Sequence, residues 1–263
     1  MDKITPENSS LWIVSYKRQE ALLNTVRTWC ESFPFETVNI LSNYQQDFSF
    51  CDEYPIKVWP NIFRQDWLTG SLAWCWNQAM LHTFEFKDWC VMSQDDVSII
   101  PGWDSLVTGQ YDTYIAPHGD VIQIQSIEGF NKIGWFDERF RAIGGCEADY
   151  LLRCLRSNSE GLSAHDEHIW QLRHNDVGLA NYFINSVKQG EILQTRMEHN
   201  LEFAQVECFN RWNDKWGESV DHLFLSKNYN RNRNWKEIDW YPAFTRRLIG
   251  LGRTKEFNYA ELY

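Results

Sequence analysis

The sequence predicts an α/β fold, with a mostly parallel central sheet flanked by helices and a small antiparallel region beside it. Two observations favour this class. Short apolar runs, rich in β-branched and aromatic residues, alternate with segments whose apolar residues recur at helical spacing. Several of the apolar runs are continuous, so the strands they form should be covered by other elements on both faces.

The first part of the chain contains the expected parallel strands and the helices between them. Strands are expected at residues 11–16 (LWIVSY), 37–43 (TVNILSN) and 89–94 (WCVMSQ), each ending in or followed by polar residues. Helices are expected at 19–31, where leucine, valine and tryptophan recur at helical spacing, and at 68–84, which is largely apolar. Strands that alternate with helices in this way are normally parallel members of one sheet.

After residue 110 the pattern changes. Residues 112–117 and 120–127 are expected to form short strands, and the second should be antiparallel and half-exposed because its polar and apolar residues alternate. Residues 130–145 are interrupted by glycine and are expected to form a loop region. A helix is expected to begin at Glu147, since acids in a first turn interact favourably with the helix dipole.

Composition and charge exclude several classes of protein. A net charge of −11 argues against nucleic acid or an anionic membrane as the main partner, because both select a basic surface. No apolar stretch approaches the ~18 residues of a transmembrane segment, and the N-terminus lacks the apolar core of a signal peptide. The seven cysteines contain no CxxC pair, which predicts reduced thiols and a cytoplasmic location.

Polar residues gather where the expected parallel strands end. Residues 15–18, 42–43 and 94–96 follow three apolar runs, and we call these segments the strand-end rim. Open α/β sheets bind their ligands beyond the carboxyl ends of their strands. Asp95 and Asp96 belong to this rim, so we expect them to hold a positively charged group there. The alternative is an exposed turn, in which the two acids would simply be solvated.

Six short motifs occur in an order that resembles one known family. They are VSYKR (14–18), NQAM (77–80), SQDDV (93–97), IGWFDERF (133–140), CEADYLLR (146–153) and NDKWG (213–217). Over about residues 10–217 they resemble the motifs of GT-A fold glycosyltransferases, especially the family 2-like group. The chain departs from that pattern at Gln94, where many members carry the first Asp of a DxD motif, and at Ala148, where an acid is usual.

The resemblance implies a fold, a reaction and a cofactor. The expected fold is a Rossmann-like GT-A catalytic domain at residues 1–200, with an antiparallel acceptor-side region and a C-terminal extension at 201–263 packed on it. The expected reaction transfers a sugar from a UDP-, GDP- or dTDP-sugar to a hydroxyl of a glycan, lipid-linked or protein-linked acceptor. The implied cofactor is Mn²⁺ or Mg²⁺, held by Asp96 and by His174, the favoured one of three nearby histidines.

The resemblance also implies roles for other motif residues. Asp95 would face the donor ribose, and the remaining donor contacts would be Ser15, Tyr16, Arg18, Asn43 and Asn77. Trp135 and Asp137 would bind the acceptor, since a tryptophan face stacks well on a sugar ring. Each side chain also has a structural alternative: the polar residues as ends of strands or helices, and Trp135 as part of the core.

Glu147 is the expected catalytic base, which takes the proton from the acceptor hydroxyl. The structural alternative is a first-turn acid that contributes only ~0.3–1 kcal/mol to its helix. Asp149 is the second candidate for the base; aligned on residues 151–153, it instead orients the start of the helix or binds the acceptor.

Two other functions stay open beside this one. The fourteen tryptophans suggest a non-catalytic carbohydrate-binding protein. A sugar-phosphate nucleotidyltransferase shares the α/β plan, but such enzymes usually begin with a glycine-rich phosphate loop, and VSYKRQE contains no glycine. We therefore expect a metal-dependent glycosyltransferase that acts in the cytoplasm.

Overall fold

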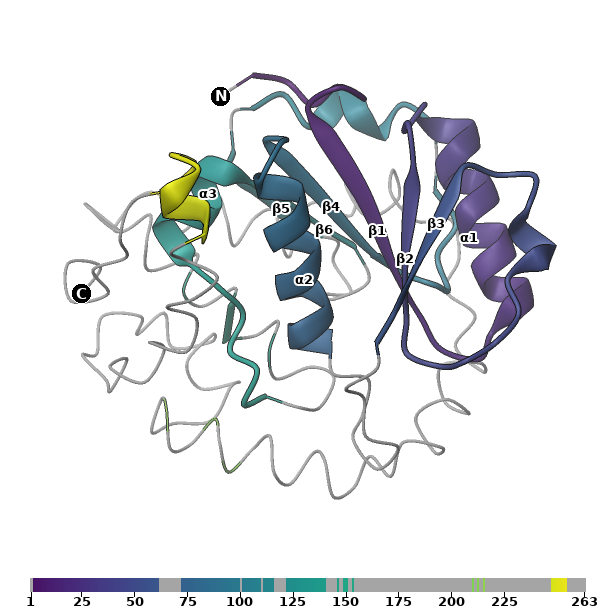
Figure 1. The fold of residues 1–263 in the computed structure, drawn as a ribbon. Helices are drawn as coiled ribbons and strands as arrows, with labels where there is room; N and C mark the ends of the chain where they lie inside the picture. The colour runs from purple at the N-terminus through teal and green to yellow at the C-terminus, as the bar shows by residue number, and fades with distance from the viewer. Residues whose placement is uncertain are drawn as a thin grey trace.

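The computed structural model describes residues 2–61, 72–99, 101–109, 111–115, 122–140 and 247–254, together with the single positions 146, 149, 150, 153, 210, 212 and 215. Within this part of the chain, six strands form one sheet in the order β3-β2-β1-β4-β6-β5 (Figure 1). The strands are β1 (Ser9–Ser15), β2 (Val38–Ser42), β3 (Ile56–Pro60), β4 (Trp89–Gln94), β5 (Thr113–Ile115) and β6 (Ile122–Ser126).

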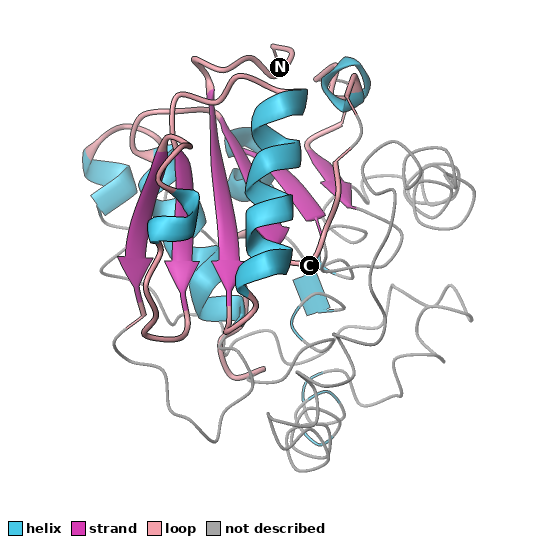
Figure 2. Ribbon diagram, turned by 90° about the vertical axis from the view of Figure 1, so that its right-hand side faces the viewer, coloured by secondary structure: helices cyan, strands magenta, loops and turns pink. Residues whose placement is uncertain are grey.

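The sheet is part parallel and part antiparallel. Strands β3, β2, β1 and β4 run in the same direction, while β6 is antiparallel to both β4 and β5. Figure 2 shows neighbouring strand arrows that end at the same edge of the sheet. The predicted α/β class is thus confirmed, and β4 has the bounds that the apolar run WCVMSQ indicated.

Helices cover both faces of the sheet, as the continuous apolar strands predicted. Helix α1 (Gln19–Ser32) packs in one buried cluster with β1 residues such as Leu11 and Ile13. Helix α2 (Leu72–Phe84) packs in a second cluster with the alternate β1 residues, Trp12 and Val14. Successive strand side chains point to opposite faces, so a strand that is apolar at every position contributes to both clusters.

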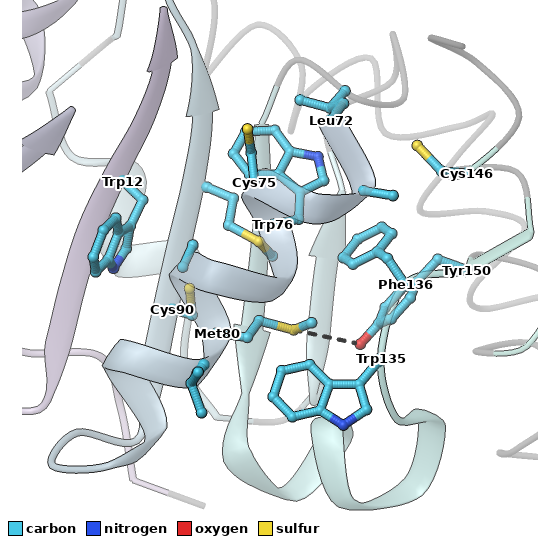
Figure 3. Close-up of a cluster of buried hydrophobic side chains, with 14 of the residues drawn as sticks. Trp12, Leu72, Cys75, Trp76, Met80, Cys90, Trp135, Phe136, Cys146 and Tyr150 are labelled. Atoms are coloured by element: carbon cyan, nitrogen blue, oxygen red, sulfur yellow. Dashed lines mark hydrogen bonds between the residues drawn. The ribbon is translucent and has the colours of Figure 1, made fainter. Parts of the chain in front are cut away.

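The tryptophans are prominent in these two clusters, and part of the second is drawn in Figure 3. The indole N–H groups of two of them find internal acceptors: Trp12 donates to Thr83 Oγ1 at 2.8 Å and Trp29 donates to Ser93 Oγ at 3.1 Å. A buried indole needs such a partner, because an unpaired polar group inside a protein is costly. These tryptophans therefore serve the core.

Two elements differ from the sequence-based expectation after residue 110. Helix α3 (Ile127–Ile133) begins inside the region expected to be strand and loop, because Ser126 caps it by accepting the N–H of Gly129 at 2.9 Å. Strand β6 is antiparallel as predicted, but it is buried along its whole length and not half-exposed. Its Gln125 remains satisfied there, since Oε1 accepts the hydroxyl of Thr113 at 2.7 Å.

Strand β3 was not predicted. It pairs with β2 at the edge of the sheet, and its partly exposed side chains leave a weak periodic signal. Two short helices, η1 (Ser49–Cys51) and η2 (Trp103–Leu106), also occur among the described residues. No helix in the described part of the chain is long and apolar enough to cross a membrane.

Residues from the expected C-terminal extension also reach the core. Trp212 is 1% exposed and Leu248 is fully buried, and both belong to the α2 cluster. The Arg253 guanidinium donates to the backbone oxygens of Phe84 and Lys87, each at 2.8 Å, just after α2. These positions therefore pack on the same body as the sheet.

Candidate functional site

The strand-end rim is assembled as predicted. In the parallel pairing of β1 with β2, Ser15 lies opposite Ser42, and in the pairing of β1 with β4, Val14 lies opposite Gln94. The backbone N–H of Asn43 donates to the carbonyl oxygen of Ser15 at 2.9 Å, which extends this alignment by one residue. The segments that follow β1, β2 and β4 therefore lie side by side at one edge of the sheet.

At the centre of the rim, Arg18 binds both acids of the SQDDV motif. Its Nη1 donates to Asp96 Oδ2 at 2.8 Å, and its Nη2 pairs with Asp95 Oδ1. The other oxygen of Asp95 accepts the backbone N–H of Tyr16 at 2.9 Å. Asp95 is 1% exposed and Asp96 is 7% exposed, so the structure excludes the alternative of a solvated turn.

Burial and charge act in opposite directions on this ion pair. Burial would lower the pKa of Arg18, but the two carboxylates outweigh it and raise that pKa, so the guanidinium stays charged. For Asp95 burial is the stronger influence: it raises the pKa to about 6, against the lowering effect of Arg18. The deeper of the two acids thus gives up its proton less readily than an exposed aspartate.

Helix α1 holds the segment that carries these acids. The hydroxyl of Thr25 donates to the carbonyl oxygen of Val97 at 2.8 Å and accepts its N–H at 3.1 Å. One turn later, Thr28 Oγ1 accepts the N–H of Ile99 at 3.1 Å. Arg18 is the N-cap residue of the same helix. The arginine and the acids are consequently positioned by one local unit, although they are far apart in the sequence.

Two aromatic rings lie against Lys17 in the rim; the sequence analysis named Tyr16 and missed Tyr44. The rings of Tyr16 and Tyr44 meet edge to face, with centroids 5.7 Å apart, and Lys17 Nζ lies 5.0 Å from each centroid. Tyr44 is 44% exposed. Lys17 has φ +61°, which is unusual for a residue with a side chain. The position of Tyr44 directly after a predicted strand end was the available signal.

The predicted donor contacts Asn43 and Asn77 are both buried and engaged. Asn43 Oδ1 accepts from Asn61 Nδ2 at 2.7 Å. Asn77 Oδ1 accepts the N–H of Phe136 at 2.8 Å, and its Nδ2 donates to the carbonyl oxygen of Phe136 and to Glu138 Oε1, each at 3.0 Å. Asn77 therefore fastens the IGWFDERF segment to α2, a structural role that the sequence did not reveal.

A second charged cluster joins three of the six motifs. The Lys215 ammonium lies between Asp137 Oδ2 at 2.9 Å and Asp149 Oδ1 at 2.6 Å. Arg139 Nη2 binds Asp137 Oδ2 at 2.7 Å, and Arg153 Nε donates to Asp149 Oδ2 at 3.0 Å. We call these five side chains the buried ion network. The motifs that contribute to it are far apart in the sequence, so this convergence is a property of the tertiary structure.

The network holds Asp137 and Asp149 in fixed positions. Their residues are 3% and 0% exposed. Burial by itself would raise the pKa of Asp137, but the charges of Lys215 and Arg139 outweigh it and hold that pKa below its ordinary value. Of the three roles considered for Asp149, namely catalytic base, acceptor contact and orientation of the helix start, this arrangement favours the last. Asp137 in turn reaches no exposed surface on which it would meet an acceptor.

The remaining predicted residues are placed as follows. Trp135 belongs to the cluster drawn in Figure 3 and is 1% exposed. Its ring lies against Phe130, with centroids 4.7 Å apart, so it offers a sugar no exposed face. The structure thus favours the core interpretation of this tryptophan over the acceptor wall. Glu147 and His174 lie outside the described residues. Cys146 and Asp149, which flank Glu147, are helical and buried.

Asp96 has the oxygen that a divalent cation would require. Its Oδ1 is buried and has no hydrogen-bond partner among the described residues. Mg²⁺ and Mn²⁺ prefer such hard oxygen ligands and often take only one or two carboxylates beside substrate phosphates. Among the described residues no group of three or more His, Cys, Asp and Glu side chains forms a complete metal cage. The chemistry of this site therefore fits a metal that is shared with a ligand.

No protein-family model matches this chain, and no curated protein matches its sequence. The functional interpretation consequently depends on the geometry of the strand-end rim and on the motifs.

Proposed function

We propose that this protein is a glycosyltransferase of the GT-A type, which moves a sugar from a nucleotide-diphospho-sugar to a hydroxyl of a glycan, lipid-linked or protein-linked acceptor. The observation that carries this proposal is the buried pair Asp95 and Asp96 at the carboxyl edge of the sheet, where Asp96 Oδ1 lacks a partner among the described residues. Arg18 supplies one positive charge for these two buried acids, so a further cationic group at Asp96 would lower the cost of burying them.

The architecture of the sheet supports the proposal. Its parallel strands place three chain segments at one edge, which is where open α/β sheets bind their ligands. The antiparallel β6 and β5 lie on the side of β4 away from β1, as an acceptor-side region would. The motifs IGWFDERF, CEADYLLR and NDKWG contribute to one ion network, as segments of a single functional unit would.

The described tryptophans give little support to a carbohydrate-binding protein. Seven of those in the described part of the chain are at most 2% exposed: Trp12, Trp29, Trp76, Trp89, Trp103, Trp135 and Trp212. A lectin stacks sugars on exposed aromatic faces, and these rings have none to offer. Within the described part of the chain, the two core clusters contain most of the tryptophans.

In the proposed reaction each residue has a limited task. A divalent cation, when bound at Asp96, would neutralise charge on the departing nucleoside diphosphate. Asp95 and the backbone of Tyr16 fix the position of Arg18 and hence the shape of the donor site. Glu147 would accept the proton of the acceptor hydroxyl as that oxygen attacks the anomeric carbon.

Thermal unfolding with UDP, GDP and dTDP tests this function. We expect one of them to raise the melting temperature by about 5 °C or more at a concentration of ~100 Kd, and only when Mn²⁺ or Mg²⁺ is present. Asp96→Asn should remove this shift, because it takes away the negative charge that binds the metal while preserving the shape of the side chain. Asp104→Asn, which changes a carboxylate paired with Lys3 in η2, serves as the control.

Two outcomes of this screen would contradict the proposal. If no nucleoside diphosphate shifts the unfolding curve, the donor assignment is wrong, and stabilisation by free glycans without metal would favour a carbohydrate-binding protein. If a nucleoside diphosphate binds equally well in EDTA, Asp96 is not a metal ligand.

A further inference from the structure

The ion pair at the strand-end rim has more negative than positive charge. Two carboxylates, Asp95 and Asp96, share the single positive charge of Arg18. When both acids are ionised, one negative charge remains without a counter-charge in this group of three. A site with this balance attracts a further cation.

The side chains of this ion pair also have hydrogen-bonding atoms without a partner among the described residues. Asp95 uses both of its oxygens, one toward Arg18 and one toward Tyr16, whereas Asp96 uses only Oδ2 toward the residues that the structure describes. Asp96 Oδ1 and Arg18 Nε are both buried and have no partner among the described residues. The two side chains of this contact therefore carry one unsatisfied acceptor and one unsatisfied donor. Such groups are rare in folded proteins and point to a ligand that supplies what is missing.

A divalent cation and a diphosphate together supply both missing partners. The cation satisfies the carboxylate oxygen, and a phosphate oxygen satisfies the guanidinium N–H. A cation at Asp96 would also repel Arg18, whose Nη1 is only 2.8 Å from the same carboxylate. The flat fork of an arginine binds phosphate as readily as carboxylate, so the displaced group has an equivalent partner in the diphosphate.

The position of Arg18 in the chain allows this exchange. It is the N-cap of α1, where its backbone lies outside the helical region, and its side chain makes no capping hydrogen bond. Among the described residues, its guanidinium contacts Asp95 and Asp96. Its side chain is still 17% exposed, so part of it remains accessible.

We propose that Arg18 is an internal counter-cation of the donor site: it occupies Asp96 until a divalent cation displaces it, and it then binds the diphosphate of the donor. This inference rests on the proposed function and adds an order to its binding events. Cation and diphosphate should strengthen each other's binding, and by linkage the effect must be the same in both directions. Part of that coupling should disappear when Arg18 is removed.

The test measures binding of Mn²⁺ alone, by electron paramagnetic resonance, to the full chain without nucleotide. Arg18→Ala should bind Mn²⁺ about tenfold more tightly than the wild type, because the cation no longer displaces a competitor. In the presence of saturating Mn²⁺, the same variant should bind the nucleoside diphosphate about tenfold more weakly. Arg27→Ala, on the exposed side of α1, is the control for a general change of charge.

Arg18→Ala leaves two buried acids without a counter-charge and could for that reason fail to fold. In that case Arg18→Lys is the variant that tests the proposal. A lysine retains the positive charge but not the fork, so Mn²⁺ affinity should stay near the wild-type value while diphosphate affinity falls. As a direct readout, the Nε–H resonance of Arg18 should move when Mg²⁺ is added without nucleotide.

The outcomes separate this inference from the proposed function. Equal or weaker Mn²⁺ binding by Arg18→Ala, an unmoved Arg18 resonance, or no Mn²⁺ binding by any variant would overturn the exchange. Those results would still leave nucleotide binding by the wild type to be judged by the thermal screen. Conversely, tighter Mn²⁺ binding by Arg18→Ala without any nucleotide binding would support the displacement step and overturn the donor assignment.

Discussion

Glu147→Gln is expected to lower sugar transfer by ~10²–10⁴-fold while leaving donor binding and stability unchanged. A positioned base contributes this much because it removes the acceptor proton as the new bond forms, and glutamine cannot accept that proton. A first-turn acid with no catalytic role would affect its helix by only ~0.3–1 kcal/mol. The measurement is the release of nucleoside diphosphate from the donor that the thermal screen identifies.

Glu128→Gln is the matched control for this variant. Glu128 is an exposed acid in the first turn of helix α3. Its replacement should leave turnover within about twofold of the wild type, since it removes the same charge with no proton transfer at stake. Turnover by Glu147→Gln within about threefold of the wild type, far from the range of a lost base, would reduce Glu147 to a helix-start residue.

Lys215→Met is expected to lower the free energy of unfolding by ~3–5 kcal/mol. The variant fills nearly the same volume but leaves Asp137 and Asp149 without the cation that bridges them, and both acids are buried. Removing one partner of a buried ion pair is costly because the remaining charge has been taken out of water and loses its compensation. Urea unfolding at pH 7 measures the change.

Lys132→Met provides the comparison on the surface. Lys132 pairs with Asp112, but its side chain is 49% exposed, and surface pairs typically contribute only ~0–1 kcal/mol. A loss of stability in Lys215→Met no larger than that of Lys132→Met would mean that the buried ion network does not hold its three segments together.

The stability difference between the wild type and Lys215→Met should depend on pH in a defined direction. Asp137 has a folded-state pKa below its ordinary value of 3.8, because Lys215 and Arg139 outweigh the effect of burial. Its contribution to stability is therefore fully present above about pH 5 and is lost as the pH falls below about 4. Lys215→Met removes part of the effect that lowers the pKa of Asp137. The difference in the free energy of unfolding between wild type and variant should therefore become smaller as the pH falls. A gap that is constant from pH 7 to pH 3.5 would contradict this account.

Much of the fold could be predicted because its signals are local. The continuous apolar runs of β1, β2 and β4 and the helical spacing in α1 lie within short windows of sequence. Elements with weak local signals were missed or misjudged: the partly exposed edge strand β3, the short helix α3, and the full burial of β6. Burial depends on what packs against a strand, and no pattern within the strand contains that information.

For the candidate site, the sequence by itself determined which segments meet at the rim. The apolar runs form parallel strands, and the carboxyl ends of parallel strands lie at one edge of the sheet. Only the tertiary structure decided how the charges are paired there. Arg18 and Asp96 are 78 positions apart, and so are Asp137 and Lys215. Ion pairs at such separations depend on the register and packing of whole elements. An unpaired oxygen on Asp96, a bridging Lys215 and a buried Trp135 become visible only when those elements are in place.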